Sequence, residues 1–170
     1  MTDQNLLSAS RINRLRVQGY TTQSPLELSQ LAFGNRFAYR ICTALLVVGV
    51  ATANTPLLSF MLVIAALGVL LPNHPFDYIY NQLLAKRMNK PKLPKRSKQL
   101  KFACAVATLW IAATIYLFTS GFLTTGYVMG SILIGIAFTV STTDFCLPSV
   151  IYNTIFLRTP PLTNPKTQTS

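Results

Sequence analysis

The stretch from Phe37 to Leu71 reads FAYRICTALLVVGVATANTPLLSFMLVIAALGVLL, and it decides the fold of this chain. A single membrane-spanning helix needs about 20 apolar residues, so this stretch is too long for one ordinary span. Asn54 and Pro56 interrupt it near the middle, because asparagine favours turns and proline removes a backbone donor. We therefore predict two short spans, at about residues 37–53 and 56–72, joined by a tight hairpin and needing tilt or local thinning of the bilayer.

A second apolar pair follows further along the chain. Residues 101–119 and 123–141 are each close to the length of one span, and the turn between them contains Gly121. The composition agrees, because 51% of the 170 residues are hydrophobic and only 11% are charged, roughly half the charge of a soluble domain. We predict an all-α membrane protein with four transmembrane helices in two hairpins, accompanied by short interfacial helices.

The basic residues indicate how the chain is oriented. The sequence holds 15 Lys and Arg against 4 Asp and Glu, a formal net charge of +11. These basic residues lie before residue 41, between 86 and 101, and after residue 157, so neither outer hairpin carries a charge. Four spans place them all on one face, whereas three spans would separate the central loop from the basic N-terminus. The positive-inside rule then predicts a multi-pass inner-membrane protein with both termini in the cytoplasm.

The same charges predict the partners. Basic residues beside a span attract anionic lipid on the cytoplasmic face, so membrane lipids are the expected partner. No arginine-rich recognition helix or aromatic-interleaved basic strand is present, which argues against nucleic acid. A protein partner or a homo-oligomer stays open.

Three regions are expected. Residues 1–35 form a cytoplasmic arm with a short helix, which begins at a capping box (Ser24-Pro25-Leu26-Glu27) and ends at Gly34 as its C-cap. The arm has no apolar block behind a basic start, so it does not resemble a cleaved signal peptide. Residues 36–158 form the four-span membrane domain, and 159–170 form a cytoplasmic tail.

An amphipathic helix is predicted between the two hairpins, from Phe76 to Lys90. One face is apolar and should meet lipid, and the other is basic and should meet water. The apolar face holds Tyr80, Leu83, Leu84 and Met88, and the basic face holds Lys86, Arg87 and Lys90.

The two halves of the membrane domain echo each other. Residues 36–38 (Arg-Phe-Ala) resemble residues 101–103 (Lys-Phe-Ala), and both 79–81 and 151–153 read Ile-Tyr-Asn. Since each half has two spans, the halves would share one orientation and be related by an axis along the membrane normal.

The predicted topology gathers a small polar cluster at the cytoplasmic boundary: His74, Asp77, Cys104, Asp144 and Cys146. In one interpretation the aspartates cap short helices and the cysteines only pack. In a second, thiols and imidazole form a redox or metal site, although no close Cys-x-x-Cys pair supports it. In a third, the cluster is a polar gate for a small solute.

Two further features concern packing. Cys42 stands apart, early in the first span, and is interpreted as a packing residue. Gly126 and Gly130 form a G-x-x-x-G pattern, which permits close approach of two helices and is expected to serve packing within the bundle. No catalytic motif is present, so no catalytic residue, cofactor or metal is predicted.

Several motifs in order resemble a bacterial domain-of-unknown-function family of small integral membrane proteins. They are His74-Pro75-Phe76-Asp77, Lys101-Phe102-Ala103-Cys104, Thr125-Gly126-Tyr127-Val128 and Thr143-Asp144-Phe145-Cys146-Leu147-Pro148-Ser149. The resemblance covers about residues 35–156 and implies a multi-span membrane domain without a known activity.

The leading functional hypothesis is a non-enzymatic membrane component, namely a scaffold, an accessory subunit or a small-solute carrier. The alternative is a membrane thiol-redox or metal-binding protein that uses Cys104 and Cys146.

Overall fold

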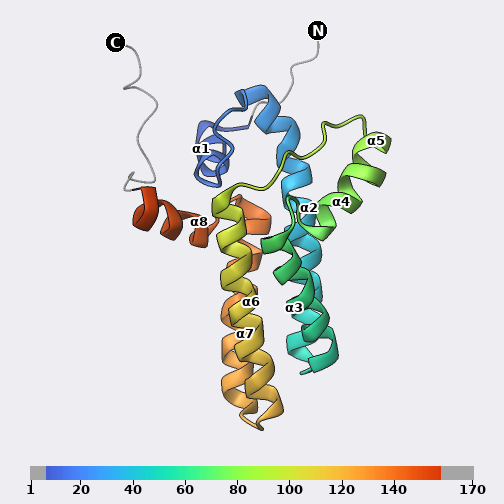
Figure 1. Ribbon diagram of the computed structural model, residues 1–170, viewed down its shortest axis with the longest axis vertical. Coiled ribbons are helices and arrows are strands. Elements are labelled where there is room, and N and C mark those ends of the chain that lie inside the picture. Colours follow the sequence, from blue (N-terminus) through green and yellow to red (C-terminus); the bar gives the residue numbers. More distant parts are fainter. Residues whose placement is uncertain (1–6, 158–170) are drawn as a thin grey trace.

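The computed structural model describes residues 7–157, and every regular element in this part of the chain is a helix. Four of these helices are long and run side by side, as Figure 1 shows. They are α2 (Pro25–Ala51), α3 (Thr55–Leu70), α6 (Lys98–Thr119) and α7 (Leu123–Thr143). The prediction of an all-α membrane protein with two helical hairpins is confirmed.

The length of α3 sets it apart from the other spans. Helices α2, α6 and α7 are each long and apolar enough to cross a membrane. At 1.5 Å per residue the 16 residues of α3 cover only about 24 Å, less than the ~30 Å hydrocarbon core. The chain then bends by 78° into the segment Pro75–Arg87, and α3 qualifies as a fourth span only together with that segment.

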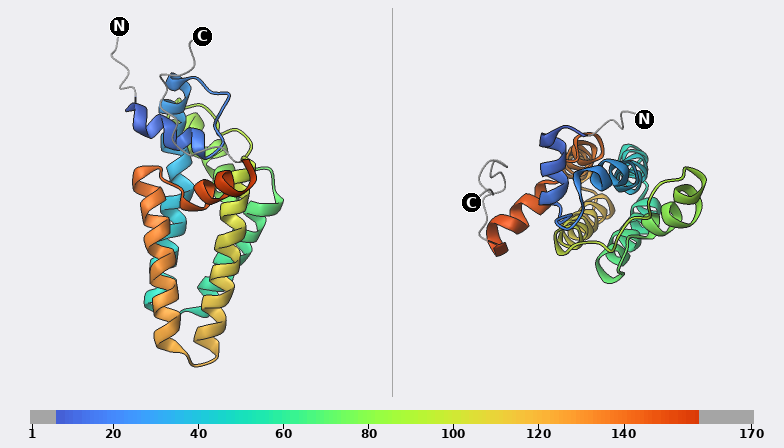
Figure 2. Two further views of the ribbon diagram at one scale, coloured as in Figure 1. Left: turned by 90° about the vertical axis from the view of Figure 1, so that its left-hand side faces the viewer. Right: turned by 90° about the horizontal axis from the view of Figure 1, so that it is seen from above.

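Short helices cover one end of the bundle, which we call the capped end. They are α1 (Ala9–Val17), α4 (Pro75–Ile79) and α8 (Leu147–Tyr152). A π-helical turn follows each of the last two: η1 (Tyr80–Leu84), which leads into α5 (Ala85–Arg87), and η2 (Asn153–Leu157). Helix α8 projects sideways from the bundle, and α1 lies across the same end (Figure 2).

The first long helix begins where predicted but does not end there. Ser24 and Glu27 form the expected capping box, in which the Glu27 amide donates to Ser24 Oγ and the Ser24 amide donates to Glu27 Oε2. The prediction that Gly34 ends a short helix is wrong, because α2 continues through it to Ala51. Gly34 instead admits a neighbour: a Cβ there would lie 2.6 Å from the ring of Tyr80.

The amphipathic segment between the hairpins is present with one correction. Leu83 and Met88 are exposed as predicted, whereas Leu84 is half-buried. The prediction that Tyr80 faces lipid is wrong: its side chain is fully buried against α2. Helical periodicity places Tyr80 on the apolar face but does not reveal that α2 covers this part of that face.

The two halves of the chain make matching contacts. Helix α2 packs along α7 and α3 packs along α6, while α4 contacts α2 and α8 contacts α6. The rings of Phe37 and Tyr80 lie 5.8 Å apart, and the equivalent rings of Phe102 and Tyr152 lie 5.5 Å apart. The internal echo in the sequence therefore corresponds to equivalent packing in the fold.

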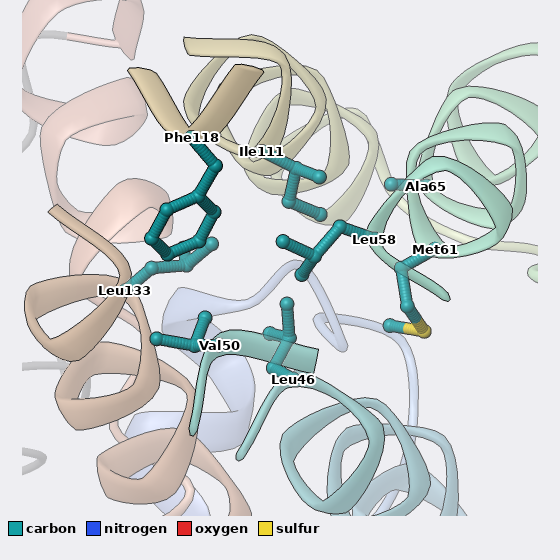
Figure 3. Packing of buried hydrophobic residues seen from close by; sticks show 8 residues of the cluster. All are labelled: Leu46, Val50, Leu58, Met61, Ala65, Ile111, Phe118 and Leu133. Carbon is teal, nitrogen blue, oxygen red and sulfur yellow. The ribbon is translucent and has the colours of Figure 1, made fainter. Parts of the chain in front are cut away.

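The centre of the bundle is an apolar core contributed by all four long helices, shown in Figure 3. Both glycines of the G-x-x-x-G pattern face neighbours in this chain. A Cβ at Gly126 would lie 2.7 Å from the Phe118 ring on α6, and one at Gly130 would lie 2.6 Å from Val50 on α2. The absent side chains are what allow α7 to approach α2 and α6.

Replacing Gly130 with alanine should destabilise the bundle by about 1–3 kcal/mol, because the added methyl group collides with Val50. Gly135→Ala, on the same helix but with no atom within 4 Å of the added carbon, is the matched control and should be nearly neutral. Thermal unfolding in detergent, followed by circular dichroism, measures both. Adding Val50→Ala should recover most of the loss, and equal unfolding midpoints for the two glycine variants would contradict this packing.

Candidate functional site

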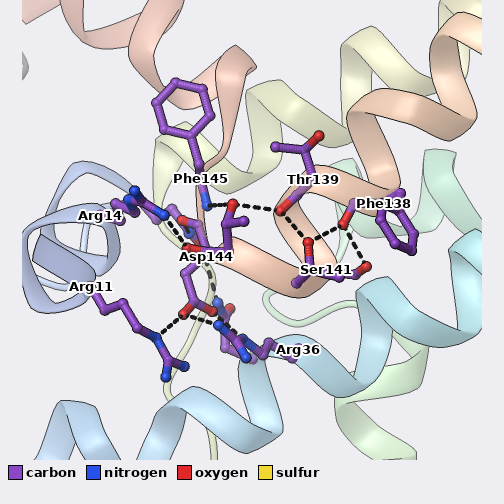
Figure 4. A network of polar contacts seen from close by, with 12 residues as sticks. Arg11, Arg14, Arg36, Phe138, Thr139, Ser141, Asp144 and Phe145 are labelled. Atoms are coloured by element: carbon purple, nitrogen blue, oxygen red, sulfur yellow. Dashed lines mark hydrogen bonds and ion pairs between the residues drawn. The ribbon is translucent and has the colours of Figure 1, made fainter. Parts of the chain in front are cut away.

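Asp144 is the centre of a buried ionic network at the capped end (Figure 4). It ends α7 in the left-handed conformation, with φ of 60°, which aspartate tolerates better than most residues. Its carboxylate accepts two hydrogen bonds of 2.6 Å from Arg36 and one of 3.1 Å from Arg11. Arg14 also donates to the Thr143 carbonyl at 2.9 Å. The network joins α1, α2 and α7.

A chain of neutral hydrogen bonds extends the network to α6. The fully buried Gln18 donates to the Asp144 carbonyl at 2.6 Å and accepts from Asn35 at 3.1 Å. Asn35 accepts from the Tyr20 hydroxyl at 3.0 Å, and Ser97, the N-cap of α6, donates to the Gln18 carbonyl. The predicted N-terminal arm is thus built into the capped end.

A second buried ion pair joins Asp77 to Arg96. Arg96 donates to the two carboxylate oxygens at 2.6 and 3.2 Å, and the side chains are only 4% and 5% exposed. Asp77 also accepts the His74 amide at 3.1 Å, which caps α4. The Arg96 amide donates to the Pro72 carbonyl, so this pair anchors the loop before α6 to the end of α3.

His74 is held neutral at the start of α4. Its Nδ1 accepts the Phe76 amide at 3.3 Å, so the proton of the neutral ring is on Nε2. Burial, followed by the positive charge of Arg96, lowers the pKa of His74 to about 4. The ring therefore carries no charge at neutral pH.

A cavity of about 120 Å³ lies beneath these groups, with walls from α2, α3, α6 and α7. Most of the wall is apolar. Its polar and thiol side chains are Tyr39, Cys42, His74, Arg96, Cys104 and Cys146. The Tyr39 hydroxyl is buried and has no hydrogen-bond partner within residues 7–157.

The structure divides the predicted polar cluster. His74, Cys104 and Cys146 line the cavity. Asp77 lies behind Arg96, which pairs with it and lines the cavity, whereas Asp144 belongs to the separate network with Arg11 and Arg36.

Three residues of the site were missed or misread from the sequence. Cys42 does not stand apart, because it lines the same cavity as the other two cysteines. Arg96 lies in a run of basic residues, and such a run predicts only the orientation of the chain in the membrane. Tyr39 has no signal in the sequence beyond its place near the start of a span.

The arrangement favours binding over acid-base or metal chemistry. The three cysteines are free, and burial raises the pKa of Cys146, which disfavours the reactive thiolate. Arg96 donates to Cys104 Sγ at 3.4 Å. In the part of the chain that the structure describes, no three His, Cys, Asp or Glu side chains are grouped so that they could hold a metal ion.

Asp144→Asn should destabilise the protein by about 3 kcal/mol, because it removes the buried countercharge of Arg36 and Arg11, which are themselves only partly buried. Glu27→Gln is the matched control, since Glu27 is exposed and only caps α2. Thermal unfolding in detergent should show a large fall in midpoint for the first variant and a small one for the second. Similar small changes in both would show that the network does not hold the capped end.

A family model described as a domain of unknown function, DUF4395, matches residues 33–156. No curated protein and no solved structure matches the chain.

Proposed function

The chain belongs to the DUF4395 family, and from that premise we propose that it is a membrane-embedded carrier that binds a small solute in the cavity between its spans. The observation that carries the proposal is the cavity itself. Protein interiors are close-packed and contain few voids larger than a water molecule. This cavity is partly open to the outside of the bundle, and its volume of about 120 Å³ is close to the ~150 Å³ of the enclosed cavity that holds benzene in an engineered protein.

The position of the cavity supports a carrier over a scaffold. It lies between the two halves of the fold, and each half contributes two helices to its wall. Membrane transporters built from repeats place their binding sites at the repeat interface. A scaffold needs no space at this position.

The thiol alternative has two observations in its favour: Cys104 and Cys146 line the same cavity, and Arg96 donates to Cys104 Sγ. A redox role requires a thiol that ionises readily, however, and burial raises the pKa of Cys146. The cysteines are therefore better suited to form a soft, weakly polar part of the cavity wall.

We also propose an orientation, with the capped end in the cytoplasm of a bacterium and the protein in its inner membrane. The basic segment from residue 86 to 101 lies at the capped end, as do Arg11 and Arg36, which pair with Asp144. The positive-inside rule favours the cytoplasm for this end. Exposed Lys86, Arg87 and Lys92 are available to anionic lipid, each worth about 1 kcal/mol near the surface.

Filling the cavity should remove the solute. Ala107 lines the cavity, whereas Ala112 on the same helix is exposed, so Ala107→Phe and Ala112→Phe form a matched pair. Mass spectrometry of small molecules that co-purify with the protein in native-membrane discs should find a compound with the unaltered chain and with Ala112→Phe. We expect at least a tenfold loss with Ala107→Phe, about 1.4 kcal/mol. Equal retention by both variants would refute the carrier proposal.

The orientation can be tested with single added cysteines at exposed positions, because two of the three native cysteines are buried and the third is half-buried. A membrane-impermeant thiol reagent should label Thr52→Cys and Ser120→Cys from outside the cell, at the two hairpin turns. Lys95→Cys should react only after the cells are opened. The unaltered chain gives the background, and labelling of Lys95→Cys in intact cells would overturn the orientation.

A further inference from the structure

We infer that the cavity opens sideways into the bilayer between α6 and α7, and that its ligand is the hydrocarbon chain of a membrane lipid. The inference rests on the proposed function and names the class of solute. The exposure of the cavity wall, the depth of the opening and the shape of the cavity carry it.

Two sides of the cavity are closed. On the side of α2 and α3 the wall is formed mainly by buried residues, among them Leu46, Met61 and Ala65. Toward the capped end the wall is formed by His74 and Cys146, which are each 4% exposed. A ligand therefore does not enter from the rear of the bundle or through the capped end.

The exposed part of the wall lies between α6 and α7. Figure 2 shows that these helices meet at their turn and diverge toward the capped end, where α8 crosses the gap. The Trp110 indole on α6 donates to the Met129 carbonyl on α7 at 2.9 Å and bridges the two helices. The opening lies between this bridge and Pro148 of α8. The partly exposed wall residues on the two helices are Ala103, Val106, Ala107, Trp110, Ile136 and Ala137.

This opening lies at the depth of the hydrocarbon core. At 1.5 Å per residue, Ala107 and Trp110 lie about 14 and 18 Å along α6 from Lys98, the charged residue at its start. The hydrocarbon core is ~30 Å thick, and α6 has no charged residue after Lys101. The molecules that meet the opening are therefore acyl chains rather than water.

The chemistry of the wall suits hydrocarbon. The wall is almost entirely apolar, and its one guanidinium group, on Arg96, is paired with Asp77. A hydrocarbon chain needs no hydrogen bond from such a wall, whereas a polar ligand atom would be buried without a partner. A chain that enters also gains dispersion contacts that an empty space cannot supply.

The shape of the cavity suits a chain rather than a ring. Its wall extends from Ala103 to Ile111 on α6, which is about 12 Å along the helix axis. The wall extends over a similar length of α2, from Ala38 to Leu46. A space of this length with a volume of only about 120 Å³ is narrow. The end of one acyl chain fits it while the rest of the lipid stays in the bilayer.

Trp110 makes the inference testable, because it is the only tryptophan in the chain and it lines the cavity. The purified protein is placed in nanodiscs of phosphatidylcholine with or without bromine on one acyl chain, since brominated chains quench tryptophan fluorescence on contact. The brominated lipid should quench Trp110 strongly. Acrylamide, a quencher that stays in water, should have little effect.

Matched variants separate a chain in the cavity from lipid around the protein. Ala107→Phe fills the cavity and should remove more than half of the quenching, whereas Ala112→Phe adds the same ring on the exposed face of α6 and should remove none. Ala137→Phe narrows the opening from α7 and should repeat the loss, so the result does not depend on one substitution. A reference chain with Trp110→Phe and Leu109→Trp reports the surrounding lipid, because position 109 is 74% exposed. Adding Ala107→Phe to the reference chain should leave its quenching unchanged.

The outcomes distinguish this inference from the proposed function. If acrylamide quenches Trp110 and the brominated lipid does not, the cavity opens to water; the lipid inference is then wrong while the carrier proposal stands. If Ala107→Phe and Ala137→Phe are quenched as strongly as Ala112→Phe, no chain occupies the cavity and the lipid inference is again wrong. Only equal retention of co-purified compounds by Ala107→Phe and Ala112→Phe refutes the carrier proposal itself.

Discussion

Two buried carboxylates, Asp77 and Asp144, govern the architecture of the capped end. A charge removed from water is tolerated only when it is paired and hydrogen-bonded, so each buried aspartate requires an arginine beside it. Asp144 draws α1 and α2 onto the end of α7, and Asp77 draws the loop before α6 onto the end of α3. The positions of α1, α2 and the loop before α6 therefore depend on two ionic centres.

These centres also shape the cavity. The Asp77–Arg96 pair places a guanidinium group at the cavity and at the same time cancels its charge. His74 caps α4 through Nδ1 and remains neutral. The cavity therefore lies next to polar side chains that are neutral or paired, while its wall is almost entirely apolar.

Much of the fold could be predicted from the sequence because bilayer thickness and backbone hydrogen bonding restrict the choices. The turn at Asn54, the capping box at Ser24 and the two hairpins all follow from local chemistry. The contact between Gly34 and Tyr80 could not be predicted. In the sequence, a glycine that makes room for a ring from a distant segment cannot be distinguished from a glycine that ends a helix. The site was only partly accessible for the same reason. The predicted topology places His74, the cysteines and Asp144 at the same depth in the membrane. It does not reveal that Asp144 pairs with Arg36 and therefore lies outside the cavity.

The exchange of helix partners between the halves has a consequence for the chemistry of the pocket. Each hairpin packs mainly against the other one, α2 on α7 and α3 on α6, rather than as an independent unit. Two identical two-span subunits related by a twofold axis would make this same set of contacts, but their pocket would have two identical sides. Because both halves lie in one chain, equivalent positions can hold different residues. One half has His74 where the other has Cys146, both at the N-caps of their short helices and both at the cavity. The single chain therefore lines one pocket with two chemically different sides.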